Sequence, residues 1–196
     1  MNRSLHFRQH IAAFGCLWML FTTIQAQNPA EITKIREVYA EIGDKIAECR
    51  AAESPEECRL YLNSLTVNKM NSPWAAVGNY GAVRDFWFER GSMEGENGPT
   101  YVLRKIEIKS VRSAHDQNEE YLFDSKGNLL FYFFKEHSGN NDQSCENRFY
   151  FQGDKLVHYT EKVNVEEAEY QIYHEADAAL VLKQAQGLSE FFQRTL

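Results

Sequence analysis

The spacing of apolar residues near the start of the chain predicts an amphipathic helix over residues 28–50. Asn28 is placed to cap this helix, Pro29 suits its first position, and Glu31 follows the cap by three residues. Intervals of three and four separate the apolar positions, which are Ile32, Ile35, Val38, Ile42, Ile46 and Cys49. A single apolar stripe on a charged helix needs a surface on which to pack.

Further along the chain the pattern changes to short apolar segments separated by turn-forming residues. These segments follow one another without intervening helices, which predicts an antiparallel meander. A loop is expected at 113–118, between the third and fourth strands. The expected strands are 59–67, 82–90, 100–112, 119–124, 128–137, 147–152 and 155–163.

The end of the chain returns to helical spacing. From residue 176 onward a helix is expected, and residues 166–174 could either extend it or form an edge strand. The chain therefore predicts an α+β fold, in which an antiparallel β-meander of about six to seven strands is flanked by N-terminal and C-terminal helices. The alternative is a sheet that closes on itself through pairing of its last strand with its first.

The strand at 128–137 is apolar on both of its faces. With a three-residue turn that places Gly127 in the left-handed conformation, strand pairing assigns one face to Tyr121, Phe123, Leu129, Phe131 and Phe133. The other face receives Leu122, Leu130, Tyr132 and Phe134. Because apolar sheet faces are normally covered, we expect the two helices to cover this sheet. We also expect truncation of Phe133 to cost more stability than truncation of Tyr132.

A partly open aromatic face is the alternative to complete coverage. Tyrosine and arginine combine a large rigid surface with hydrogen bonding, and they are therefore good binding anchors. The candidate binding residues are Tyr132, Arg148, Tyr150 and Tyr159, extended by Trp87 and Arg84.

The first 26 residues have the order of a secretory signal. Arg3 and Arg8 precede the apolar segment 11–24, which is shorter than a membrane span, and small Ala26 precedes the expected cleavage site. Residues 27–196 are then expected to form one exported domain, periplasmic or secreted, without a membrane anchor. An uncleaved N-terminal anchor and lipid attachment at Cys16 are the alternatives.

Net charge narrows the class of partner, and the cysteines indicate which covalent links are expected. Removal of the signal leaves 19 basic and 28 acidic residues, a net charge of −9, which argues against binding to nucleic acid. An exported chain matures in an oxidising compartment. We expect Cys49 and Cys58 to form a disulfide, since only eight residues separate them, with two reduced, buried thiols as the alternative. Cys145 is the odd cysteine, and it is either buried or free for an intermolecular bond.

No motif in the sequence indicates a particular reaction. The histidines His115, His137, His158 and His174 lack metal-ligand spacing, and no nucleophile elbow or phosphate-binding loop occurs, so no metal or cofactor is expected. Cys145 with His137, and the carboxylates Glu107, Glu120 and Glu136, are weak catalytic candidates.

The segments "FDSKGNLLFYF" and "RFYFQGDKLVHY", together with the "QAQ" end of the signal, resemble small exported proteins of bacterial envelopes. The resemblance implies export and a helix-flanked meander, but no activity. The function we expect is binding without catalysis, through the aromatic sheet face, of a protein, a peptide, a glycan or a small apolar ligand. An envelope hydrolase with a dispersed active site and a structural or assembly subunit are the alternatives.

Overall fold

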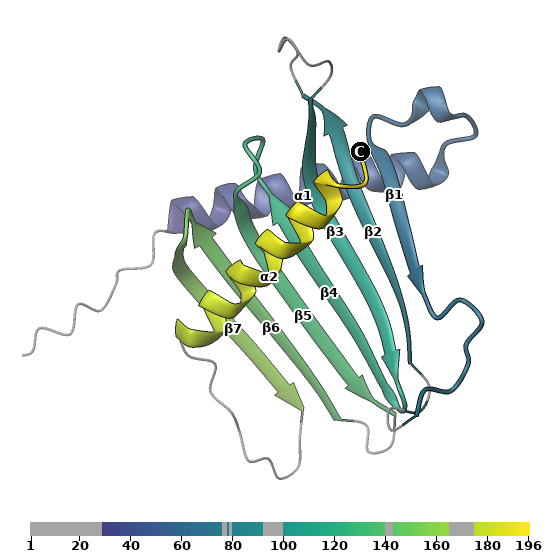
Figure 1. Cartoon of the computed structure of the whole chain (residues 1–196). Coiled ribbons are helices and arrows are strands. Elements are labelled where there is room, and N and C mark those ends of the chain that lie inside the picture. Colours follow the sequence, from purple (N-terminus) through teal and green to yellow (C-terminus); the bar gives the residue numbers. More distant parts are fainter. Residues whose placement is uncertain (1–28, 76–77, 79, 92–99, 140–142, 165–174) are drawn as a thin grey trace, which may run out of the picture.

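A computed structural model describes residues 29–75, 78, 80–91, 100–139, 143–164 and 175–196 (Figure 1). The predicted signal and residues 166–174 lie outside the described residues. The chain forms α1 (Pro29–Ala51), the 3-10 helix η1 (Pro55–Glu57), seven strands and α2 (Glu175–Gln193). The strands are β1 (Tyr61–Val67), β2 (Tyr80–Arg90), β3 (Tyr101–Arg112), β4 (His115–Phe123), β5 (Leu129–Ser138), β6 (Gln143–Gln152) and β7 (Lys155–Asn164).

The seven strands form one antiparallel sheet in sequence order, from β1 at one edge to β7 at the other. The sheet is open, because β1 pairs with β2 and β7 pairs with β6. The predicted α+β meander with a helix at each end is therefore confirmed, and the closed alternative is excluded.

The two helices lie on opposite faces of the sheet, α2 in front and α1 behind in Figure 1. We call these faces the α1 face and the α2 face. The stripe of α1 packs with Trp87, Leu122, Phe131 and Tyr150. The stripe of α2 packs with a larger set of sheet residues, which includes Phe86, Phe88, Leu103, Ile106, Tyr121, Phe123, Tyr132, Phe149 and Phe151. The helices therefore supply the cover that the two apolar faces of β5 require.

The register of two hairpins differs from the prediction because each contains a β-bulge. Phe123 pairs with Leu129 as expected, but Leu122 pairs with Phe131, so Leu130 is an extra residue. Phe131 therefore lies on the α1 face and Tyr132 on the α2 face, which reverses the predicted assignment. A bulge moves every residue beyond it to the face of the sheet opposite to the one expected without the bulge.

The second bulge lies in the β6–β7 hairpin. Phe151 pairs with Leu156, whereas Tyr150 pairs with His158, so Val157 is the extra residue. A two-residue turn at Gly153 and Asp154 without a bulge predicts that Phe149 pairs with His158, but the bulge pairs Phe149 with Tyr159 instead.

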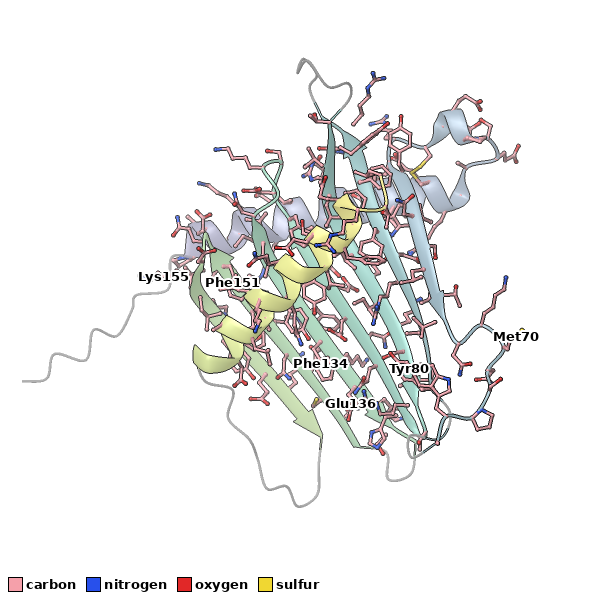
Figure 2. The ribbon with its side chains drawn as sticks, in the orientation of Figure 1. Met70, Tyr80, Phe134, Glu136, Phe151 and Lys155 are labelled. Atoms are coloured by element: carbon pink, nitrogen blue, oxygen red, sulfur yellow. A yellow bond between two sulfur atoms is a disulfide. The ribbon has the colours of Figure 1, made fainter. Side chains whose placement is uncertain are left out.

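The turn chemistry of the first hairpin is as predicted. Gly127 has φ +85°, and the Asp124 carboxylate accepts hydrogen bonds of 2.8 Å from the backbone N–H groups of Lys126 and Asn128. The expected loop at 113–118 is instead mostly strand. Ser113, at φ +53°, makes a tight turn, and β4 begins at His115. This end of β4 is polar, and its Gln117 side chain hydrogen-bonds Glu136, a residue that Figure 2 shows far along the sheet from Phe151.

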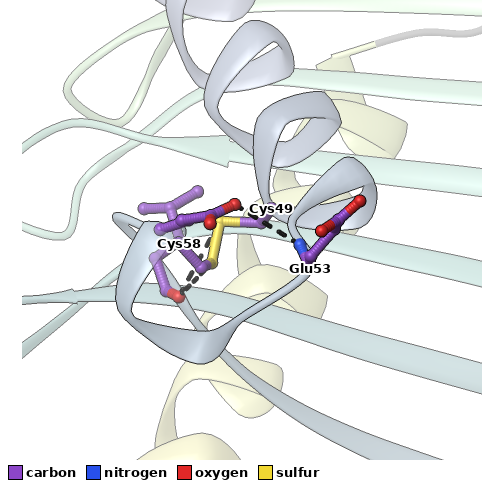
Figure 3. Close-up of a disulfide and its surroundings, with 5 residues drawn as sticks. Cys49, Glu53 and Cys58 are labelled. Carbon is purple, nitrogen blue, oxygen red and sulfur yellow. Dashed lines mark hydrogen bonds between the residues drawn. A yellow bond between two sulfur atoms is a disulfide. The ribbon is translucent and has the colours of Figure 1, made fainter.

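The predicted disulfide joins Cys49 near the end of α1 to Cys58 after η1 (Figure 3). Between the two cysteines, the backbone N–H of Glu53 donates a 3.4 Å hydrogen bond to the Glu57 carboxylate. Leu60 is buried immediately after the bridge, among the apolar residues that pack with α1. The disulfide thus ties the end of α1 to the start of the sheet.

Candidate binding pocket

A pocket of about 270 Å³ lies between α1 and the β5–β6 part of the sheet. We call it the α1 pocket. Helix α1 supplies three of its lining residues and the sheet supplies four. They are Ile35, Arg36 and Tyr39 from α1, Phe131 and Phe133 from β5, and Arg148 and Tyr150 from β6.

The helix positions its three lining residues by their spacing. Ile35 belongs to the apolar stripe and is buried, while Arg36 and Tyr39 lie beside the stripe, three positions apart and hence on neighbouring turns. The Tyr39 ring contacts Phe131 edge to face, with ring centroids 5.4 Å apart. Tyr39 therefore forms a wall of the pocket rather than a solvated side chain.

The sheet provides an aromatic floor through directly paired positions. Phe131 pairs with Tyr150, and their ring centroids are 4.9 Å apart. Phe133 pairs with Arg148, whose guanidinium lies 5.2 Å from the centre of the Phe133 ring. The floor is therefore aromatic on one side and cationic on the other.

Two arginines give the pocket its charge. Arg148 forms an ion pair with Glu146, and Arg36 lies 5.7 Å from the centre of the Tyr150 ring. Arg36 forms no ion pair with any residue that the structure describes. The guanidinium groups of Arg36 and Arg148 and the carboxylate of Glu146 together give the pocket one net positive charge.

His158 lies next to the pocket without adding to its charge. Its ring contacts Tyr150 with centroids 5.4 Å apart. Burial lowers the pKa of His158, and the nearby positive charge of Arg36 lowers it further. The imidazole is therefore mainly neutral at pH 7.

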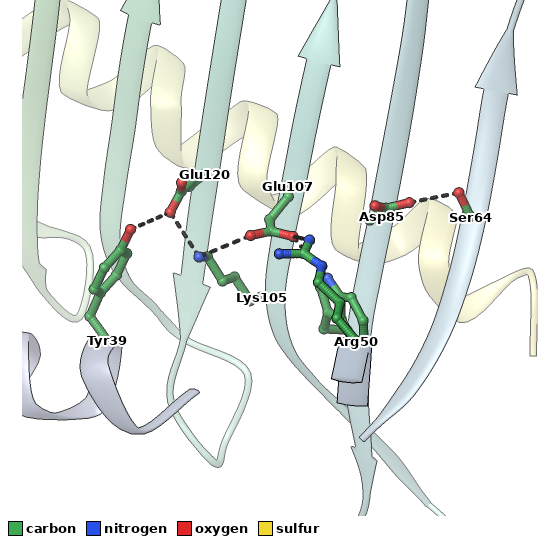
Figure 4. A network of polar contacts seen from close by, with 8 residues as sticks. Tyr39, Arg50, Ser64, Asp85, Lys105, Glu107 and Glu120 are labelled. Carbon is green, nitrogen blue, oxygen red and sulfur yellow. Dashed lines mark hydrogen bonds and ion pairs between the residues drawn. The ribbon is translucent and has the colours of Figure 1, made fainter. Parts of the chain in front are cut away.

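A network of charged side chains anchors Tyr39 on the far side of the pocket (Figure 4). The Tyr39 hydroxyl donates a 2.6 Å hydrogen bond to Glu120, and Lys105 bridges Glu120 and Glu107 at 2.8 and 3.2 Å. Burial and the hydrogen bond to Glu120 raise the pKa of Tyr39. The Tyr39 hydroxyl therefore stays protonated, and its hydrogen bond to Glu120 fixes its orientation.

Glu107 is held by three groups. It accepts hydrogen bonds from Arg50 at 2.5 Å and from the Trp87 indole at 3.0 Å, in addition to its contact with Lys105. Burial alone would raise the pKa of Glu107, but the charges of Lys105 and Arg50 outweigh it and lower the pKa. These contacts favour a structural ion network over a pair of catalytic carboxylates.

The structure divides the six predicted binding residues between the two faces. Arg148 and Tyr150 line the α1 pocket, and Trp87 lies on the same face. Tyr132 and Tyr159 pack on the α2 face, where their hydroxyls donate to Glu119 and Asn147. Arg84 pairs with Ile108, which also belongs to the α2 face.

Arg36 and Tyr39 were not among the predicted binding residues. Their signal in the sequence is a basic and an aromatic residue on neighbouring turns, directly beside the apolar stripe. That signal becomes informative only when the sheet positions beneath α1 are known.

The structure brings Glu107 and Glu120 together as paired strand positions, but it does not bring Cys145 and His137 together. Glu136 pairs with Cys145, so His137 points to the face opposite Cys145. Burial is the main cause of the raised pKa of the Cys145 thiol. Among the described residues, no group of three or more His, Cys, Asp and Glu side chains could hold a metal ion.

Comparison of the sequence with family models, and of the chain with curated proteins and solved structures, gives no match. Within the described part of the chain, neither helix is long and apolar enough to cross a membrane.

Proposed function

We propose that this protein is an exported, non-enzymatic binding protein that takes a small aromatic or branched aliphatic monocarboxylate in the α1 pocket. The observation that carries the proposal is the position of Arg36 and Arg148 around an aromatic pocket of about 270 Å³. Apolar walls with a few placed polar groups are typical of small-molecule sites.

The charge of the pocket favours a monoanion. A guanidinium group presents a planar set of donors that matches the two oxygens of a carboxylate. Arg148 already contacts Glu146, whereas Arg36 has an aromatic contact and no ion pair with a described residue. A ligand carboxylate at Arg36 would bring the charge of the pocket to zero, and the ligand's apolar body would contact Phe131 and Tyr150.

The lining favours binding over hydrolysis. Arginine stays protonated in proteins and is a poor proton acceptor, and the raised pKa of Tyr39 makes it a poor general base. Ile35, Phe131 and Phe133 bring no titratable group to the pocket. The side chains there can orient a carboxylate ligand without transforming it.

Export is the second part of the proposal. It is supported by the signal-like residues 1–26 and by the Cys49–Cys58 disulfide, which suits an oxidising compartment. N-terminal sequencing of protein recovered from the cell envelope or the medium should begin near Gln27. Recovery of the chain only in the cytoplasm with Met1 intact would contradict this part.

Binding is tested by calorimetric titration with 3-phenylpropanoate and with 3-phenylpropan-1-ol, which has the same apolar body without the charge. We expect the carboxylate to bind at least about tenfold more tightly, because a hydrogen bond to a charged group contributes about 1.5–3 kcal/mol. Equal affinities, or no heat for either compound, would contradict the proposed site.

Two variants on α1 provide a matched comparison. Arg36→Met should remove most of the preference for the carboxylate, whereas Lys34→Met, which deletes the same charge from an exposed position, should leave it unchanged. An equal loss in both variants would indicate general attraction to a positive helix rather than a specific contact.

A further inference from the structure

A second pocket, of about 150 Å³, lies on the α2 face between the start of α2 and strands β5 and β6. Its apolar walls come from both the sheet and the helix. They are formed by Tyr132, Phe134, Phe149, Leu180 and Val181. Phe149 is fully buried at the base, while Leu180 is 53% exposed and marks the mouth.

Asn147 on β6 lines the same pocket and is 1% exposed. Its Oδ1 accepts a 2.9 Å hydrogen bond from the Tyr159 hydroxyl, which leaves the Nδ2 hydrogens as the groups available to a ligand. Nδ2 has no hydrogen-bond partner among the residues that the structure describes. An unsatisfied buried donor is costly, so such groups in proteins are usually satisfied by a partner.

The surroundings of this donor point to the chemistry of its partner. A buried water typically makes about three hydrogen bonds, whereas most of the residues that line this pocket with Asn147 are aromatic or aliphatic. The lining includes Asp177 and Gln184 but no basic side chain, so it has no positive charge to match an anion. An apolar cavity of about this volume is large enough for a molecule of the size of benzene.

We propose that the α2-face pocket binds a small neutral aromatic or aliphatic molecule with a carbonyl oxygen that accepts a hydrogen bond from Asn147 Nδ2. The apolar part of the ligand lies between Phe134, Phe149 and Val181. This site is on the opposite face of the sheet from Arg36 and Arg148, so it is independent of the proposed carboxylate site.

The test uses acetophenone and ethylbenzene, which differ in that a carbonyl group replaces a methylene group. In titrations of the isotope-labelled protein followed by NMR, acetophenone should bind about fivefold to tenfold more tightly, as expected for one hydrogen bond. It should also shift the Asn147 side-chain amide resonances. Equal affinities, or unchanged Asn147 resonances at saturation, would overturn the proposal.

Variants separate the donor from the rest of the cavity. Asn147→Leu keeps the branched shape and the number of heavy atoms of the side chain without the donor, and it should bind the two probes equally. Tyr159→Phe leaves Nδ2 in place and should retain the preference for acetophenone. A preference that survives in a folded Asn147→Leu variant would contradict the assignment. If that variant does not fold, the Asn147 resonances of the parent protein decide the question.

The two proposed sites can fail separately. Arg36→Met should leave acetophenone binding unchanged, and Asn147→Leu should leave 3-phenylpropanoate binding unchanged. If neither acetophenone nor ethylbenzene binds the parent protein at any attainable concentration, the α2-face pocket holds solvent only and the proposal is wrong.

Discussion

The ammonium group of Lys105 lies 2.8 Å from the carboxylate of Glu120, beneath α1 and next to the Tyr39 wall of the α1 pocket. The Lys105 side chain is 5% exposed, and its Nζ lies 4.7 Å from the centre of the Tyr39 ring. One buried cation thus forms ion pairs with both Glu120 and Glu107 and also contacts the helix. The pocket therefore rests on a charged network as well as on apolar packing.

Replacing Lys105 by methionine should destabilise the protein by about 3–5 kcal/mol at pH 7, because it leaves Glu120 without its cation and Glu107 with Arg50 as its remaining charged partner. At a pH above about 4.3, the pKa of an unfolded glutamate, the lowered pKa of Glu107 stabilises the parent protein. This stabilisation is lost as the pH falls through the pKa of Glu107 in the folded protein. In the variant, burial disfavours the charged carboxylate. The difference in unfolding free energy, measured in urea, should therefore shrink from pH 7 to pH 4; a difference independent of pH would contradict this account.

His158 should report on the charge of the α1 pocket. Because Arg36 is one cause of its lowered pKa, Arg36→Met should raise the pKa of His158 towards its ordinary value. Saturation with 3-phenylpropanoate should raise it too, since a bound carboxylate offsets the guanidinium. Proton NMR of the imidazole resonances between pH 5 and 8 measures both effects, and Lys34→Met serves as the control that should leave the titration unchanged.

Tyr132→Ala should cost about 3–5 kcal/mol of stability, as large-to-small core changes do. Tyr132 is 7% exposed and packs between Tyr121 and Phe149, whereas Phe133 is only half-buried beside the α1 pocket. Phe133→Ala should therefore cost less, which reverses the order expected from the sequence. Thermal or chemical unfolding of the two variants decides the order.

The three cysteines after residue 26 should differ in reactivity. Without reductant, an alkylating reagent should modify Cys145 slowly, because burial raises its pKa, and should leave Cys49 and Cys58 unmodified. Reduction should make Cys49 and Cys58 reactive and lower the free energy of unfolding by about 2–3 kcal/mol. Peptide mapping after alkylation measures the pattern, and equal labelling of all three before reduction would exclude the disulfide.

Much of the fold could be predicted from local pattern. Pro29 and the isoleucine stripe define the start and the buried face of α1, and Gly127 with Asp124 defines a turn whose geometry the structure reproduces. The strand register could not be predicted. Leu130, the extra residue of the first bulge, lies between Leu129 and Phe131, and Val157, the extra residue of the second, follows Leu156, so a shift by one residue changes the apolar pattern little.

The candidate site was predictable only in part, for a related reason. Arg148 and Tyr150 stood out as a basic and an aromatic residue on one strand. Their meeting with Arg36 and Tyr39 depends on which face of the sheet α1 covers and where it crosses β5 and β6. Those features follow from packing between segments far apart in the chain, which periodicity does not encode.

The most direct test of the central claim is to locate bound 3-phenylpropanoate by intermolecular nuclear Overhauser effects. The proposal predicts contacts from the ligand ring to Phe131, Tyr150 and Ile35, together with a shift of the Arg36 guanidinium resonance. Contacts confined to residues of the α2 face, or a bound ligand that leaves Phe131 and Arg36 unperturbed, would contradict it.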